Sequence, residues 1–295
     1  MSGRDNWSCN PRGGCSDPAG WDEGLGPQSD ETGEEGRVDY EPGSQTRRMA
    51  IKVLYHDADL IVVDKPPGLC VEYDLEDLPS VVGQLTAKRI ITDEESSWHA
   101  VYPLDAEASG VLVLARSPDA AETLRGQMGG GVFELCMSAI VRGSVSAEYG
   151  TIKHPIREPS AGRVARVDVH RGKPAVTDWR LRDRFVGFAL LDCLPRTAVA
   201  SQVRIHLATA GLPLAVDSAH DGADGLMLSS FKAGYHPSHK HPERPLIARL
   251  TLHAANVGFP HPRTGMPLGF ESPWPKDFRA ALQQLQKYGR LPPRS

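Results

Sequence analysis

The sequence lacks the features that define several large protein classes. No apolar run approaches the ~20 residues that a membrane-spanning helix needs. The opening residues, MSGRDNWSCNPRGG, contain no apolar stretch of the kind found in a secretory signal peptide. The five cysteines are odd in number and show no C-x-x-C spacing, which argues against a disulfide framework and a cysteine zinc site. We therefore expect a cytoplasmic protein without membrane association.

Motifs for nucleotide cofactors and metals are also missing. The sequence contains no G-x-G-x-x-G, P-loop or G-x-S-x-G pattern. His236, His239 and His241 lie close together, but no cysteine is near them, and their spacing fits neither a zinc finger nor H-E-x-x-H. We expect no cofactor and no metal, and we interpret this stretch as a basic loop that contacts phosphates. Its other basic residues are Lys232, Lys240, Arg244 and Arg249.

Positive charge is scarce for a protein that binds nucleic acid mainly by charge. Residues 1–50 hold five Lys and Arg against ten Asp and Glu, a balance of −5. The remaining residues hold 28 basic and 27 acidic groups, a balance of +1. Binding to RNA would therefore have to use a local basic patch or the shape of the RNA.

The composition divides the chain into two parts. Residues 1–49 are rich in Gly, Ser, Asp, Glu and Pro and carry few aliphatic side chains, which predicts a disordered acidic segment. Residues 50–290 have the periodic apolar pattern of one folded domain. A polar, interrupted stretch at about 218–246 is interpreted as a long loop or insertion.

The folded part is expected to contain more strands than helices. Residues 51–69 predict a β-hairpin that ends in a K-P-P-G turn, VYPLD and GVLVLAR are β-rich, and FELCMSAIVRG predicts a buried strand. Ser117 and Pro118 predict the start of a helix that ends at Gly129–Gly131. A second, amphipathic helix is expected before Gly289. Together these predict an α+β fold with a mixed, mostly antiparallel sheet and flanking helices.

Asp105 is the main candidate for chemistry. It lies in YPLDAEASG, after an apolar run and before small residues that leave space beside its carboxylate. Gly110 would let the backbone approach a ligand or turn sharply. On the residues alone, two interpretations stay open: a catalytic carboxylate, or a turn aspartate that hydrogen-bonds its own backbone.

Two further sets of polar residues suit ligand binding. Lys65 opens the rigid turn KPPG, where its ammonium would hold a phosphate or a carboxylate, or would simply be solvated. Gln202, Arg204 and His206 alternate in SQVRIH, and in a strand they would share one face. That face either projects into a cleft that binds a carboxylate, phosphate or base, or meets solvent.

Taken in order, the motifs between Ile51 and Phe278 resemble those of the RluA-like family of RNA pseudouridine synthases. VLYHDADLIVVDKPPGL resembles the family's opening hairpin and K-P-x-G turn, and YPLDAEASGVLVLAR resembles H-R-L-D-x-x-T-S-G. VFELCMSAIVRG takes the place of the K-x-Y-x-A-x-x-x-G strand. RTAVASQVRIHL resembles T-G-R-T-H-Q-I-R-x-H-L, and LAVDSAHDG stands where the family has G-D-x-x-Y-G. RLTLHAANVGFPHPRTG resembles the R-x-x-L-H-A strand and H-P-x-T-G turn.

The resemblance implies a pseudouridine synthase-like catalytic domain over residues 50–290. Such a domain isomerises uridine to pseudouridine in structured RNA, ribosomal or transfer, as a monomer without a cofactor. The target base leaves its stack, which costs a few kcal/mol for a paired base. By the resemblance, Asp105 is the nucleophile, acting covalently at the sugar C1′ or on the base. Arg204 pairs with it and keeps it ionised.

Several positions depart from the family pattern where the base should bind. Pro103 replaces an arginine that helps to occupy the space left by the flipped base. Cys136 is assigned to the position of a tyrosine that packs on the uracil, and it offers no ring for stacking. The segment T-G-R-T-H-Q reads TAVASQ, so a basic residue and an imidazole are lost. Gln202 and Leu104, with Arg204, complete the substrate-binding residues that the resemblance implies.

These departures leave three functions open, because a fold does not fix a function. The first is an active pseudouridine synthase with an altered RNA-binding surface. The second is a catalytically weak or inactive homologue that binds RNA through the same cleft. The third is a different reaction that uses Asp105 and the Cys136 thiol.

Overall fold

The structure is a computed structural model that describes residues 8–9, 15–16, 51–71, 80–92, 98–158, 165–220, 223–235 and 242–291. It divides the chain into two units, Met1–Ala50 and Ile51–Ser295. In the first unit it describes two short antiparallel strands, β1 (Ser8–Cys9) and β2 (Cys15–Ser16). The predictions of a disordered N-terminal segment and of a loop around His236, His239 and His241 lie largely or wholly outside the described residues.

The second unit is built on a large sheet with four α-helices. The sheet strands are β3 (Lys52–His56), β4 (Leu60–Lys65), β5 (His99–Ala100), β6 (Ser109–Ala115), β7 (Glu134–Arg142), β8 (Tyr149–Ile152), β11 (Thr177–Phe185), β12 (Phe188–Pro195), β13 (Leu252–Pro260) and β14 (Pro267–Glu271). The helices are α1 (Val81–Ala87), α2 (Pro118–Gly129), α3 (Gln202–Thr209) and α4 (Lys276–Tyr288), with a short 3-10 turn, η1, at Leu228–Ser230. Two further strands, β9 (Ile156–Arg157) and β10 (Arg166–Val167), form a separate two-stranded antiparallel sheet.

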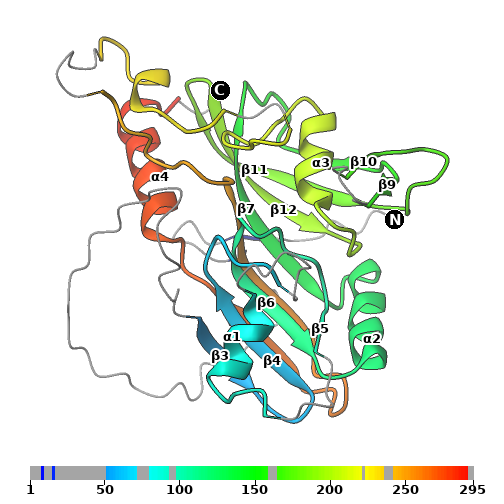
Figure 1. The fold of residues 1–295 in the computed structure, drawn as a ribbon. Helices are drawn as coiled ribbons and strands as arrows, with labels where there is room; N and C mark the ends of the chain where they lie inside the picture. Colours follow the sequence, from blue (N-terminus) through cyan, green and yellow to red (C-terminus); the bar gives the residue numbers. More distant parts are fainter. Residues whose placement is uncertain are drawn as a thin grey trace. The chain divides into compact units, whose positions relative to one another are not determined.

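The sheet is mixed and mostly antiparallel, as predicted. Its hydrogen-bonded order is β3-β4-β6-β13-β7-β12-β11-β8, with β5 added beside β6 and β14 beside β13 (Figure 1). The β6–β13 pair is parallel, and the other pairs of this sheet are antiparallel. Because β6 pairs with both β4 and β13, the first hairpin is joined to the rest of the sheet through β6.

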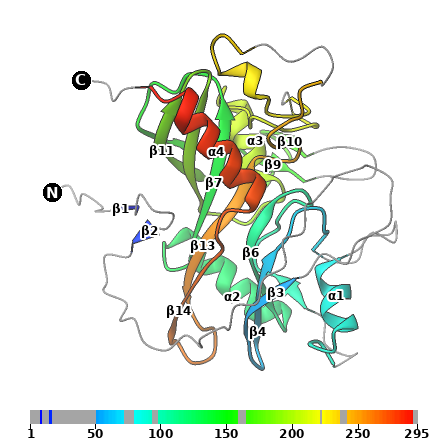
Figure 2. The ribbon, with the colours of Figure 1, turned by 90° about the vertical axis from the view of Figure 1, so that its left-hand side faces the viewer.

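Helices cover both faces of the sheet. Phe278, Leu282 and Leu285 of α4 pack in one apolar cluster with Ile140 of β7 and Leu190 of β12. The neighbouring residues of these strands belong to a larger cluster that also contains side chains of α2 and α3. Since successive side chains of a strand point to opposite faces, α4 covers one face while α2 and α3 lie on the other (Figures 1 and 2). None of the helices in the described segments has the length and apolar character needed to cross a bilayer.

Most local predictions are confirmed. The expected hairpin is β3–β4, the buried strand is β7, and the amphipathic C-terminal helix is α4. The helix expected after Ser117 is α2, and the Ser117 hydroxyl accepts a hydrogen bond from the backbone N–H of Ala120, as an N-cap should. The run VYPLD is not a strand; the short strand here is β5, which ends before it.

The strand interpretation of SQVRIH is wrong, because Ser201 is the N-cap residue of α3 and the other five residues lie in this helix. Every residue from Gln202 to Leu207 is buried. Alternation predicts a strand when one face meets the core and the other meets solvent. Here both the apolar and the polar side chains are enclosed by protein, so their alternation carries no information about the backbone period.

Gly110 lies where the backbones of two strands meet. Its φ is +115°, and a Cβ built on it would lie 2.1 Å from the carbonyl oxygen of Ala254 in β13. A side chain here would therefore push β6 away from β13. The close approach that Gly110 allows is to a neighbouring strand, and it holds the start of β6 and the loop before it at the centre of the sheet.

Candidate active site

Asp105 lies in a loop that Lys65 fastens to the first hairpin. Lys65 is fully buried, and its Nζ donates to the carbonyl oxygens of Ala106 and Ala108 at 2.8 Å and of Pro66 at 3.2 Å. The interpretation of Lys65 as a solvated turn lysine is wrong. Burial lowers the pKa of Lys65 to about 7, against the opposing effects of Cys70 and Asp105. The carbonyl oxygens on both sides of Glu107 are thus tied to the end of β4.

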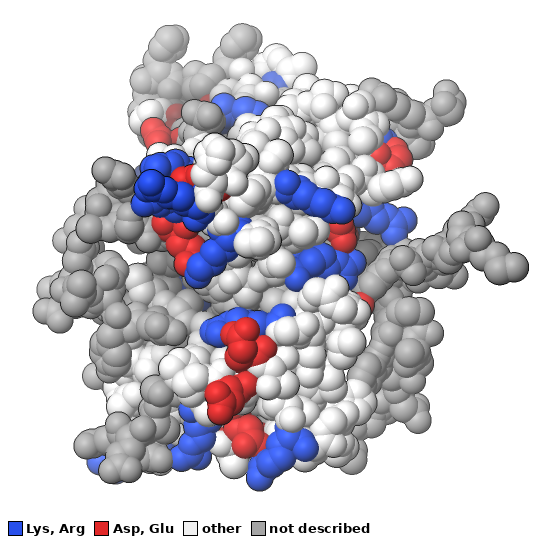
Figure 3. Space-filling model, turned by 90° about the vertical axis from the view of Figure 1, so that its right-hand side faces the viewer, with Lys and Arg blue, Asp and Glu red and all other residues white. Residues whose placement is uncertain are grey.

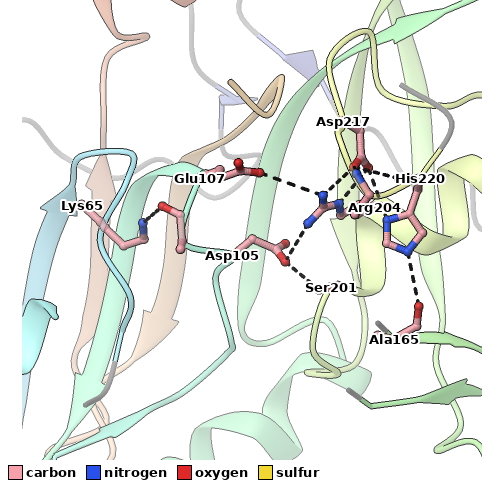
Figure 4. Close-up of polar contacts among 10 residues, drawn as sticks. Lys65, Asp105, Glu107, Ala165, Ser201, Arg204, Asp217 and His220 are labelled. Atoms are coloured by element: carbon pink, nitrogen blue, oxygen red, sulfur yellow. Dashed lines mark hydrogen bonds and ion pairs between the residues drawn. The ribbon is translucent and has the colours of Figure 1, made fainter. Parts of the chain in front are cut away.

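Arg204 projects from α3 into a group of three carboxylates. Its Nε donates to Oδ2 of Asp217 at 2.7 Å, and its Nη2 bonds the second oxygen, Oδ1. Its Nη1 lies 3.6 Å from Oδ1 of Asp105, and its Nη2 lies 4.0 Å from Glu107 (Figure 4). The expected contact with Asp105 therefore exists, but it is the weaker one. The main partner of Arg204 is Asp217, in a bidentate pair of the strong kind.

The pair of Arg204 and Asp217 keeps both groups charged inside the protein. Asp217 is almost fully buried, and burial acts to raise its pKa. The bonds from Arg204 and from the backbone N–H of Ala219 outweigh burial, so the pKa of Asp217 is lowered. Burial likewise acts to lower the pKa of Arg204, but the bond to Asp217 and the charge of Asp105 raise it on balance. Arg204 thus presents a fixed positive charge to Asp105.

Ser201 makes the shortest contact to Asp105. Its hydroxyl donates to Oδ1 of Asp105 at 2.6 Å (Figure 4). Ser201 is the N-cap residue of α3, yet its side chain makes no capping hydrogen bond, and its backbone is left-handed with φ 55° and ψ 22°. In the sequence, Ser201 stands out only because it replaces a histidine of the family pattern. Its hydrogen bond to the Asp105 carboxylate was not predicted.

Gln202 lines the cavity beside Asp105, but its amide is already engaged within the protein. Its Oε1 accepts from the Thr197 hydroxyl and the Val199 N–H. Its Nε2 donates to the carbonyl oxygen of Val176 and to the Thr177 hydroxyl. Gln202 therefore fixes the segment before α3 against the strand beside it. His206 is buried in the same helix and contacts the Thr177 hydroxyl.

The space beside Asp105 is small. A cavity of about 20 Å³ adjoins the carboxylate, which is room for about one water molecule. Its walls include Pro103, Leu104, Gln202 and Met137. A nucleobase does not fit in this volume.

A larger hollow of about 460 Å³ lies next to this cavity, and Pro103 and Ala198 belong to the walls of both. The hollow is also lined by two ion pairs, Arg125 with Glu122 on α2 and Lys173 with Glu158. Its volume is in the range of ligand pockets, ~300–1,000 Å³. Figure 3 shows Lys and Arg side chains on both sides of a depression that crosses this face of the molecule. Pro103 and Ala198 therefore lie between the small cavity beside Asp105 and a larger hollow lined by charges of both signs.

Cys136 does not lie beside Asp105. Leu135 and Met137 line the cavity, and Cys136, between them on β7, points to the opposite face. Ser138, on that same opposite face, accepts a hydrogen bond from Trp274 just before α4. Counting back from Gly143 with Ala139 in register puts the tyrosine of K-x-Y-x-A-x-x-x-G at Met137. The assignment to Cys136 was displaced by one residue, and a role for its thiol beside Asp105 is excluded by this geometry.

The basic residues expected around the polar insertion are differently placed. Arg249 makes a bidentate pair with Asp277 at 2.6 and 2.9 Å and is largely buried. The Lys232 ammonium lies 4.3 Å from the centre of the Tyr288 ring. Lys240 lies outside the described residues. Arg249 is thus a structural residue that holds the start of α4, and it is not available to a phosphate.

One cluster of possible metal ligands, Asp57, Asp59 and His261, occurs in the described part of the chain. The His261 Nε2 lies 2.8 Å from Oδ2 of Asp57, and its Nδ1 accepts from the N–H groups of Arg263 and Thr264. Arg263 also pairs with Asp59 at 2.7 Å. Both imidazole nitrogens are therefore engaged within the protein, and the cluster joins the β3–β4 turn to the β13–β14 turn.

Comparison with known proteins identifies the family of this fold and site. The family model described as RNA pseudouridylate synthase matches residues 59–209, about half of the chain, including Asp105 and Arg204. The chain belongs to this family. A Bacillus subtilis protein named uncharacterized RNA pseudouridine synthase YlyB is 30% identical over 252 residues, 82% of this chain and 75% of that protein. Ribosomal large subunit pseudouridine synthase C of Escherichia coli is 28% identical, over 81% of this chain and 71% of the relative.

Solved structures agree on the fold. Human RNA pseudouridylate synthase domain containing 4 has a TM-score of 0.54 at 22% identity and covers 82% of this chain and 95% of its own. Human RNA pseudouridylate synthase domain containing 1 has the same TM-score at 21% identity, over 80% and 87% of the two chains. The resemblance found in the motifs, and the α+β fold that it implied, are therefore confirmed.

Proposed function

We propose that the protein isomerises uridine to pseudouridine in structured RNA, with Asp105 as the covalent nucleophile. The observation that carries the proposal is the meeting of Asp105 and Arg204 at 3.6 Å, in a chain of this family, beside a cavity that shares wall residues with a larger polar hollow. The nucleophile and its cationic neighbour come from segments 99 positions apart, and the fold brings them together.

The reaction asks little of the protein besides a carboxylate and a shaped site. The N1–C1′ bond of uridine breaks, a C5–C1′ bond forms, the hydrogen of C5 leaves to solvent and N1 gains one. No net oxidation occurs, so no redox cofactor is needed. Asp105 forms the covalent bond, either at C1′ or on the base, and the charge of Arg204 favours its ionised form. Arg204 does not become part of the product, so it can stabilise the ionised form of Asp105 in every catalytic cycle.

The substrate is proposed to enter through the larger hollow. Lys173 on its wall is 64% exposed and makes a surface ion pair with Glu158, of the weak kind that a phosphate can displace. Arg125, also on the wall of this hollow, donates to the carbonyl oxygens of Ala100 and Val101 and so supports the segment that leads to Pro103. Two relatives named as ribosomal large subunit pseudouridine synthases make ribosomal RNA the first substrate to test.

The test compares the wild type with Asp105→Asn. Each protein is incubated with unmodified transcripts of ribosomal and transfer RNA, and pseudouridine is mapped by chemical labelling and sequencing. The expected result is new pseudouridine at defined positions with the wild type alone. If the wild type leaves no more pseudouridine than the variant on any RNA, the synthase proposal is lost.

A second function is favoured by one observation, the small volume beside Asp105. A cavity of about 20 Å³ suits a protein that binds RNA without converting it. Filter binding of the same transcripts separates the two functions. RNA that is retained by both wild type and Asp105→Asn, without pseudouridine in either, would establish an RNA-binding homologue. We further propose a cytoplasmic monomer, to be checked by cell fractionation and by light scattering after gel filtration.

A further inference from the structure

Ser201 adopts a backbone conformation that local preferences disfavour. A non-glycine residue with φ of 55° is uncommon, and among side chains Asn and Asp tolerate this region best. Within the described residues, Arg89 is the only other non-glycine residue with a positive φ. Strained backbone of this kind persists only where the surrounding structure enforces it, and it concentrates at functional sites.

Ser201 also leaves its helix uncapped. Serine is among the best N-cap residues, because its hydroxyl accepts a hydrogen bond from the first turn of the helix. Ser80 and Ser117 do this for α1 and α2, each with an extended backbone. Ser201 occupies the same position in α3, but its hydroxyl donates to Asp105 instead. Two local costs, the left-handed backbone and the missing cap, therefore accompany one contact with the nucleophile.

The contact selects one oxygen of the Asp105 carboxylate. The hydrogen bond from Ser201 and the ion pair with Arg204 both reach Oδ1. Among the described residues, none donates a hydrogen bond to Oδ2. A carboxylate held at one oxygen cannot rotate freely, so its other oxygen keeps a fixed position beside the cavity.

We propose that Ser201 is a positioning residue that holds Oδ1 of Asp105 and leaves Oδ2 as the attacking oxygen. The inference rests on the proposed function. The family pattern has a histidine at this place, so the role belongs to this chain's own sequence. Ser201 acts through Asp105 and forms no bond to the nucleoside, so its loss slows the chemical step and leaves RNA binding intact.

Three variants separate positioning from a structural role. Ser201→Gly removes the hydroxyl and suits the left-handed backbone. Ser201→Ala removes the hydroxyl and keeps the strain. Ser201→Asn keeps a side chain that tolerates this backbone and restores a donor. The readouts are kcat and KM from tritium release by a [5-³H]uridine-labelled transcript of large-subunit ribosomal RNA, Tm, and the Asp105 rotamer in crystal structures of wild type and Ser201→Gly.

The expected results differ in sign between stability and rate. Ser201→Gly should keep or raise Tm while kcat falls roughly ten- to a hundredfold, the scale of a misplaced reacting group, with KM changed less than about twofold. Ser201→Asn should recover most of kcat, and Asp105 should occupy several rotamers in Ser201→Gly. A Ser201→Gly protein with wild-type kcat, or one that loses Tm and RNA binding together, overturns the inference.

The rotamer measurement keeps the inference separate from the proposed function. If the wild type converts no uridine but Asp105 is ordered in it and disordered in Ser201→Gly, the proposed function fails while the hold on the carboxylate stands. If Asp105 keeps a single rotamer in both proteins, the hold itself is refuted, whatever the activity.

Discussion

Removal of charge from Asp217 should destabilise the protein far more than the same change at Asp105. Asp217 is 1% exposed and makes two bonds to Arg204, whereas Asp105 is 16% exposed and lies 3.6 Å from the guanidinium. The variants are Asp217→Asn and Asp105→Asn, which keep the shape of the side chain. Glu107→Gln, at 49% exposure and 4.0 Å, is the matched control at the same arginine.

The magnitudes follow from the geometry around Arg204. Breaking a buried pair by removing one partner costs ~3–5 kcal/mol of stability. Because asparagine keeps some of the hydrogen bonds, we expect Asp217→Asn to cost about 3 kcal/mol, at the lower end of this range. Asp105→Asn leaves the main pair intact and should cost about 1 kcal/mol or less, and Glu107→Gln less than about 0.5 kcal/mol. For a domain of this size 1 kcal/mol shifts Tm by about 2–4 °C, so Asp217→Asn should lower Tm by about 6–12 °C.

Differential scanning calorimetry at neutral pH measures the three shifts. A fall in Tm for Asp105→Asn that equals that of Asp217→Asn would show that Arg204 depends equally on both carboxylates. The assignment of Asp217 as its main partner would then be refuted. The pKa of Asp217 is lowered in the folded state, so its contribution is present above the unfolded value near 3.8 and is lost as the pH falls below it. The Tm difference between wild type and Asp217→Asn should therefore shrink in acid.

Three further predictions concern the sheet and its turns. Met137→Tyr places a ring at the cavity and should raise synthase activity roughly tenfold, on the ~1–3 kcal/mol scale of base stacking. Cys136→Tyr overpacks the other face of the sheet and should lower the free energy of unfolding by about 1–3 kcal/mol without a gain in rate. Equal rates for both variants would place neither side chain at the base. Gly110→Ala should prevent folding or lower Tm by more than about 10 °C, because its Cβ would meet backbone at 2.1 Å; a soluble variant with wild-type Tm contradicts the strand spacing. Burial acts to raise the pKa of Asp57, but hydrogen bonds from Tyr55 and from backbone N–H groups bring it down to about 2. The free energy of unfolding should therefore fall by about 2 kcal/mol as the pH falls from 4 toward 2. Urea titrations should find this fall reduced in Asp57→Asn.

Local patterns predicted the elements that carry their own signals. The hairpin β3–β4, the capped helix α2 and the amphipathic helix α4 depend on neighbours in the sequence, and each forms where its residues indicate. The helix α3 was not predicted, because all its residues from Gln202 to Leu207 are buried and its polar side chains bond to residues outside the helix. Asp105 and Arg204 were predicted from the ordered motifs. These motifs imply that the two residues meet, but they do not give the geometry of the contact.

The parts of the site that were missed depend on distances that no motif contains. Lys65 looked like a surface lysine because its acceptors, the carbonyl oxygens of Ala106 and Ala108, lie more than forty positions away along the chain. The assignment of Cys136 failed by one position, which in a strand reverses the face. Ser201 was interpreted only as the replacement of a histidine in the family pattern, and only the fold shows that its hydroxyl reaches the Asp105 carboxylate.

The parallel pairing of β6 with β13 sets the order in which the molecule can be completed during synthesis. Ser109, four residues after Asp105, contacts His253 of β13 across a sequence separation of 144 residues. While the ribosome makes the intervening residues, one edge of β6 has no partner from β13. Long-range contacts of this kind slow folding and expose strand edges before they form. The loop of Asp105 is therefore made early but acquires its final support late, when β13 emerges, and a nascent chain that ends before β13 should carry the aspartate without a finished site around it.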